Sequence, residues 1–165
     1  MDYERQIQGI LKKSFPLLKN HKIIVIQTRF TYGIRAIYLY FFSIYLIGRG
    51  AEKGLSTGGI AHELSHIEIF KKWGFWKSVW LAFIQYFSGD IRRKVERGAD
   101  LVAISKGYGN ELYKTRSRLP KNNERVKKLL KDYYLSLNEI KKYTKQQKST
   151  SYSNFIQKYI YLKRF

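Results

Sequence analysis

Two histidines four residues apart, with a glutamate directly after the first, constrain this chain more than any other feature. They form the motif His-Glu-Leu-Ser-His within residues 58–70. On an α-helix, positions four apart share one face, so His62 and His66 can reach one metal ion while Glu63 can reach a water on it. This is the H-E-x-x-H arrangement of two zinc ligands and a general base. The chain therefore needs a helix here and a further ligand from elsewhere.

A catalytic zinc takes three protein ligands and keeps a fourth position open. The chain has no cysteine, which excludes thiolate metal sites, thiol nucleophiles and a disulfide scaffold. Its remaining histidine, His21, lies in a predicted turn and is interpreted as an exposed turn residue rather than a ligand. Glu68 lies about 200° around the helix from His66 and so points away from it, and Asp90 lies in a predicted loop.

Two carboxylates farther along the chain are better placed. Glu96 and Asp100 are four apart on a predicted helix, so they share a face. The neighbouring Ala99, Val102 and Ala103 are small or apolar, as a face packed against another helix requires. Two carboxylates at such an interface need cationic partners, and a zinc ion with its histidines is a suitable one.

Together the two segments resemble the gluzincin metallopeptidases, in particular the branch in which H-E-x-x-H is followed by E-x-x-A-D. That branch includes the HtpX-type and CAAX-prenyl-type membrane proteases and the small soluble minigluzincins. The matching residues are His62, Glu63, His66, Glu96, Ala99 and Asp100. The resemblance covers about residues 55–108. The 29 residues between His66 and Glu96 leave no room for a transmembrane hairpin, which favours the small soluble branch.

The resemblance implies a zinc-dependent metalloendopeptidase with one Zn²⁺ per chain. Glu96 would be the third ligand beside the two motif histidines, and Asp100 would hydrogen-bond a ligand histidine. Glu63 would be the catalytic general base for a zinc-bound water. A second donor to the oxyanion is usual, and Tyr108 is the catalytic candidate, with a core tyrosine as the alternative. We expect an extended peptide or protein substrate to add to an edge strand within residues 36–48.

The order of predicted elements is a helix, strands and then further helices, which indicates an α+β fold. We expect a small zincin-type domain whose short, mainly antiparallel sheet packs on the motif helix and a second zinc-ligand helix, with additional C-terminal helices. Ser56 or Thr57 should cap the motif helix and Gly74 should end it. We assign residues 1–145 to this zincin-like metallopeptidase domain and residues 146–165 to a C-terminal tail.

The net charge of +20 favours acidic partners such as nucleic acid or an anionic membrane, although a solubilising surface explains it equally well. No nucleic-acid motif accompanies the charge. Residues 73–89 hold three tryptophans and one lysine and are interpreted as a mostly buried helix, with contact at a membrane interface as the alternative. The N-terminus lacks a secretory signal, so we expect a cytoplasmic protein, with peripheral membrane association as the alternative.

Two alternatives to an active peptidase remain. One is a catalytically silent zinc-binding module that interacts with acidic partners. The other is a latent peptidase whose C-terminal tail covers the cleft. Oligomeric state and cleavage specificity have no signal in the sequence.

Overall fold

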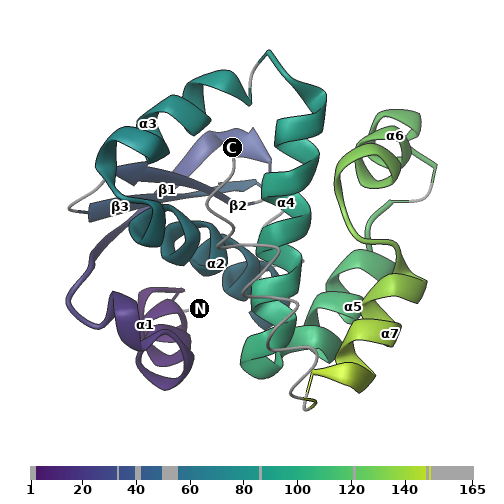
Figure 1. The fold of residues 1–165 in the computed structure, drawn as a ribbon, viewed down its shortest axis with the longest axis horizontal. Coiled ribbons are helices and arrows are strands. Elements are labelled where there is room, and N and C mark those ends of the chain that lie inside the picture. Colours follow the sequence, from purple (N-terminus) through teal and green to yellow (C-terminus); the bar gives the residue numbers. More distant parts are fainter. Residues whose placement is uncertain are drawn as a thin grey trace.

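The computed structural model describes residues 3–32, 34–39, 42–49, 56–85, 87–120, 122–147 and 149. The predicted tail beyond residue 149 lies outside them. The described helices are α1 (Tyr3–Ser14), α2 (Thr57–Trp73), α3 (Phe75–Ile84), α4 (Gly89–Ala103), α5 (Gly109–Ser117), α6 (Glu124–Tyr133) and α7 (Leu137–Gln146), and the strands are β1 (Lys22–Tyr32), β2 (Ile34–Leu39) and β3 (Phe42–Arg49). The order is helix, strands, helices, so the α+β prediction is confirmed. The sheet and α1–α3 lie on one side of α4, and α5–α7 lie on the other (Figure 1).

The sheet is mixed, with strand order β1-β3-β2. β3 pairs in parallel with β1 and antiparallel with β2, so the prediction of a mainly antiparallel sheet is not confirmed. The chain reverses between β1 and β2, but β3 then lies between them instead of β2 pairing directly with β1. β3 is paired on both sides, so within the predicted substrate-binding segment 36–48 only β2 lies at an edge of the described sheet.

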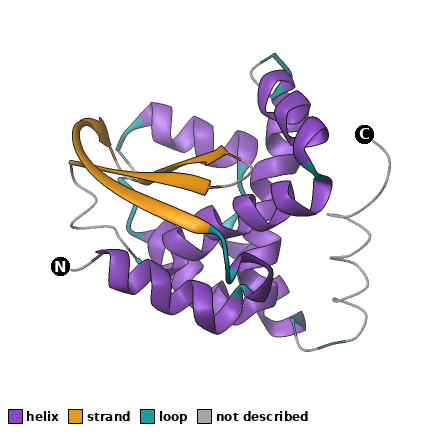
Figure 2. Ribbon diagram, turned by 90° about the vertical axis from the view of Figure 1, so that its left-hand side faces the viewer, coloured by secondary structure: helices purple, strands orange, loops and turns teal. Residues whose placement is uncertain are grey.

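Helix α2 is the centre of the fold. It contacts β2, α1, α3, α4 and α5. Figure 2 shows the strands above α1, the helix next to the N-terminus. Its buried apolar side chains join those of α1, β3 and α4 in one core, whose members include Ile7, Leu11, Tyr45, Ile60, Leu64, Ile67, Ala99 and Val102. α4 carries Glu96 and Asp100, and its small or apolar residues Ala99, Val102 and Ala103 are buried. The predicted packing face of this helix is therefore confirmed.

Local chemistry sets the ends of α2. The Ser56 hydroxyl accepts the backbone N–H of Gly59, as an N-cap should. Gly74 ends the helix with φ of +82°, a conformation that favours glycine. Gly58 permits a close approach to α5, because a Cβ atom there would lie 2.4 Å from the carbonyl carbon of Glu111. Both predicted ends of the motif helix are therefore confirmed, with Ser56 as the cap.

The prediction of a mostly buried helix within residues 73–89 is wrong for one side of that helix. α3 buries Ser78 and Leu81, but its large aromatic side chains lie exposed on the opposite side. The reason is its position at the margin of the domain, where only one face of the helix meets the core. Within the described part of the chain, no helix has the length and apolar character needed to cross a membrane.

Candidate metal centre

Three side chains from two helices converge on one point. His62 and His66 lie one turn apart on α2, and Glu96 lies on α4, which packs against α2. The Nε2 atoms of the two histidines are 3.1 Å apart. The Oε2 atom of Glu96 lies 3.2 Å from the Nε2 of His62 and 3.4 Å from the Nε2 of His66. The three predicted ligands therefore present one donor atom each, at the corners of a nearly equilateral triangle.

This triangle has the size that a zinc ion requires. Zinc binds imidazole nitrogen and carboxylate oxygen at about 2.0–2.2 Å in tetrahedral geometry, which separates the ligand atoms by about 3.3–3.6 Å. The observed separations are at or slightly below that range. The donor set of two neutral imidazoles and one carboxylate also suits zinc. The residues present thus fit the ion in number, type and spacing.

The orientation of His62 is set by a buried carboxylate. Its Nδ1–H donates to Oδ1 of Asp100 at 2.7 Å, which leaves Nε2 directed at Glu96 and His66. Burial alone would lower the pKa of His62, but the charge and hydrogen bond of Asp100 raise it to about 10. Burial would likewise raise the pKa of Glu96, yet hydrogen bonds from the two histidines hold it well below its usual range. Without a metal, these shifts favour a protonated His62 beside an ionised Glu96.

Asp100 is fully buried and accepts three hydrogen bonds. Besides His62, its donors are the Arg116 guanidinium on α5 and the backbone N–H of Leu135, each at 3.0 Å. Burial would raise the pKa of Asp100, but the positive charge of Arg116 and the contact with His62 hold it below its usual value. Asp100 is therefore an ionised acceptor that ties His62 on α2 to α5 and to the chain that follows α6.

A tyrosine from the C-terminal part completes the surroundings of His62. The centroid of the Tyr134 ring, just after α6, lies 5.7 Å from that of the His62 ring. The Arg116 guanidinium carbon lies over the Tyr134 ring, 3.8 Å from its centroid. Burial raises the pKa of Tyr134 far above its usual value, and the charge of Glu96 raises it further. The Tyr134 hydroxyl therefore keeps its proton and can act as a hydrogen-bond donor.

Glu63 is half-buried beside His62 on α2. Burial raises the pKa of Tyr45 on β3, and the negative charge of Glu63 raises it further. The same charge contributes to the raised pKa of Tyr134, after burial and the charge of Glu96. The carboxylate of Glu63 is thus within electrostatic reach of both Tyr45 on the sheet and Tyr134 beside His62.

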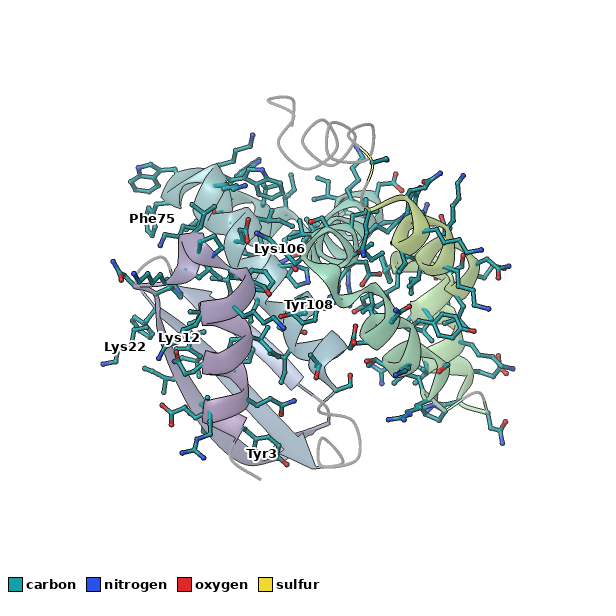
Figure 3. The ribbon with its side chains drawn as sticks, turned by 90° about the horizontal axis from the view of Figure 1, so that it is seen from below. Tyr3, Lys12, Lys22, Phe75, Lys106 and Tyr108 are labelled. Carbon is teal, nitrogen blue, oxygen red and sulfur yellow. The ribbon has the colours of Figure 1, made fainter. Side chains whose placement is uncertain are left out.

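The remaining sequence candidates lie elsewhere. Tyr108 lies at the end of the π-helical turn Ile104–Tyr108, between α4 and α5 (Figure 3). Its hydroxyl is hydrogen-bonded to the Ser14 hydroxyl of α1 at 2.8 Å. The predicted exposure of His21 is wrong, because it is buried and its Nε2 lies 2.8 Å from the Ser43 hydroxyl. Glu68 points away from the metal centre as predicted, toward Lys106 at 3.2 Å.

Sequence reasoning missed Arg116 and Tyr134. The chain has 32 Lys and Arg residues and 14 tyrosines, so neither residue type stands out, and both lie beyond the H-E-x-x-H and E-x-x-A-D segments. The need of a buried Asp100 for further donors could have pointed to a cation such as Arg116, but no signal in the sequence pointed to Tyr134. No family model, curated protein or solved structure matches this chain.

Proposed function

We propose that this protein is a zinc-dependent metallopeptidase of the zincin type, with one zinc ion held by His62, His66 and Glu96. The observation that carries the proposal is the triangle of their three ligand atoms, with separations of 3.1 to 3.4 Å. When bound, zinc supplies a Lewis acid that polarises a carbonyl and lowers the pKa of coordinated water.

The protein's own residues have separate tasks in this proposal. Glu63 accepts a proton from the attacking water and passes it to the leaving amine, because its carboxylate adjoins His62 without being a ligand. Asp100 orients His62 and keeps its Nε2 lone pair available. Tyr134, held in its protonated form, donates a hydrogen bond to the developing oxyanion and takes the role that the sequence suggested for Tyr108.

The number of ligands favours a catalytic over a structural zinc. Structural sites are closed by four protein ligands, whereas catalytic sites use three. Among the described residues, His62, His66 and Glu96 are the cluster of three that could hold an ion. A silent structural module would also have no use for a half-buried Glu63 next to the ligands.

The sheet supports a peptide as the substrate class. β2 lies at the edge of the described sheet and contacts α2, the helix that carries both histidines. An extended peptide can pair with such an edge through main-chain hydrogen bonds. We therefore place the substrate along β2, rather than along β3 at the centre of the sheet.

Metal analysis combined with a peptide-cleavage assay tests the proposal. We expect about one zinc per chain and hydrolysis of an unstructured protein substrate. Glu63→Gln should retain the zinc and lose hydrolysis, because it removes the proton acceptor and no ligand. Glu124→Gln is the matched control, since Glu124 lies exposed on α6 and pairs with Lys127.

Two results would contradict the proposal. A zinc-free protein that stays zinc-free after incubation with the metal would remove the metal centre. A Glu63→Gln protein that cleaves as fast as the unmodified chain would assign the hydrolysis to another group or to a contaminant.

A further inference from the structure

One side of α3 is covered by large apolar side chains that lie exposed. The exposed fractions of these six residues run from 43% to 82%. We call them the α3 aromatic face: Phe75, Trp76, Val79, Trp80, Phe83 and Phe87. At about 100° per residue, the five that lie within the helix span an arc of about 140°. Phe75 marks this face at the outer margin of the molecule (Figure 3).

The outward direction of this face is set by the contacts on the opposite side of α3. Leu81 is buried there, and the buried Ser78 hydroxyl donates to the backbone oxygens of Phe70 at 2.7 Å and Gly74 at 2.6 Å. These bonds hold α3 against the end of α2. A rotation that buried the aromatic face would break them and expose Leu81.

The area of the α3 aromatic face exceeds what an ordinary surface carries. With about 200 Å² for each aromatic side chain, the exposed fractions of its five aromatic residues leave roughly 650 Å² of ring surface in water. The largest apolar patch on a typical monomer covers about 300–600 Å² and is often functional. A patch of this size on one helix indicates an interaction surface.

The positive charge of the chain distinguishes between the possible partners of the α3 aromatic face. Residues 71–94 contain six lysines and arginines and one aspartate. A second copy of the chain would bring two net charges of +20 together, which opposes self-association. A nucleic acid would need cations between the stacking rings, but Lys77 lies outside the aromatic arc, with its Nζ 5.9 Å from the Trp73 ring.

We propose that the α3 aromatic face binds the interface of an anionic lipid membrane, with α3 lying parallel to the surface. Tryptophan and phenylalanine favour the boundary between headgroups and acyl chains. The net charge of +20 adds an electrostatic attraction to the anionic headgroups, and each lysine or arginine that comes near the surface strengthens the binding about fivefold. This surface is separate from the metal centre, and its test needs no peptidase activity.

Binding to lipid vesicles tests the proposal with the full chain. We expect the protein to co-sediment with phosphatidylcholine vesicles that contain phosphatidylserine, and to bind pure phosphatidylcholine about tenfold more weakly or less. Brominated lipids should quench its tryptophan fluorescence. The double substitution Trp76→Ser and Trp80→Ser should weaken binding by about tenfold or more. Both indoles are more than half exposed, so the fold, checked by circular dichroism, should survive.

Leu17→Ser is the matched control, since Leu17 is another exposed large apolar residue, outside the α3 aromatic face. Its vesicle binding should equal that of the unmodified chain. Vesicle binding that the tryptophan substitutions leave unchanged would overturn the proposal. So would a protein that ignores vesicles but forms a dimer, or binds single-stranded DNA, in a way that these substitutions abolish.

Discussion

Replacing Asp100 with asparagine should weaken both the fold and the metal centre, by amounts that can be separated. In the structure, Oδ1 of Asp100 accepts from His62 and Arg116, and Oδ2 accepts from the Leu135 N–H. Asparagine has one acceptor oxygen and one NH₂ donor. Whichever way the amide is turned, its NH₂ group faces a donor, either the Leu135 N–H or the pair formed by His62 and Arg116.

The expected magnitudes follow from these contacts. The Arg116 side chain is 13% exposed, and leaving a buried cation without its anion costs about 3–5 kcal/mol of unfolding free energy. The loss of the acceptor that orients His62 should weaken zinc binding by about 10–100-fold. Guanidinium unfolding of the metal-free protein measures the first quantity, and competition with a chromophoric chelator measures the second.

A second substitution distinguishes the two effects. Adding Arg116→Met to Asp100→Asn removes the unpaired cation, so part of the lost stability should return. Zinc affinity should stay low, because His62 still lacks its carboxylate. Asp90→Asn is the control, since Asp90 is 86% exposed at the start of α4. Recovery of zinc affinity along with stability would refute the orientation argument, as would an Asp100→Asn protein that binds zinc normally.

The remaining predictions concern the hydrogen-bond donor to the oxyanion, the binding of the metal and the packing of the helices. Tyr134→Phe should lower kcat by about 10²–10³-fold at unchanged zinc content, because it removes the proposed oxyanion donor, and Tyr108→Phe should leave peptide cleavage unchanged. Since the pKa of metal-free His62 is raised to about 10, zinc binding at pH 7 should release about one proton, and zinc affinity should rise up to tenfold per pH unit as the pH rises toward 9. Calorimetry in buffers of different ionisation enthalpy measures the number of protons released. The absence of proton release would contradict the prediction. Gly58→Ala should destabilise the fold by about 1–3 kcal/mol, because the new Cβ would clash with the backbone of α5. Gly9→Ala, at an exposed position of α1 where a Cβ meets no other atom, should stabilise the fold by about 0.5–1 kcal/mol. Equal melting temperatures of the two variants would contradict the packing argument.

Much of the local structure could be predicted from the sequence. The Ser56 cap and the Gly74 end of α2 are confirmed. The cap depends on a hydrogen bond between residues three positions apart, and the end depends on the positive φ of a single glycine, so the local residue types are enough to specify both. The helical spacing of the motif similarly predicted that His62 and His66 share a face. The ligand roles themselves remain predictions.

The sheet order could not be predicted in the same way. The apolar pattern indicates strands but carries no information on which strands pair, and the insertion of β3 between β1 and β2 depends on contacts across the whole domain. Likewise, the aromatic pattern of α3 is compatible with a buried or an exposed helix. Only its place at the margin of the domain decided that one face stays in water.

The candidate metal centre likewise depends partly on local sequence and partly on tertiary packing. The sequence by itself determined that the two histidines lie one turn apart and that Glu96 and Asp100 share a face, since both follow from the geometry of a single helix. Only the tertiary structure decided that Arg116 and Tyr134 join them. These residues come from a part of the chain without a recognisable motif, and they reach Asp100 and His62 because α5 and the end of α6 pack beside α4. A fully buried carboxylate needs donors, but which elements of the chain supply them depends on the packing of the whole fold.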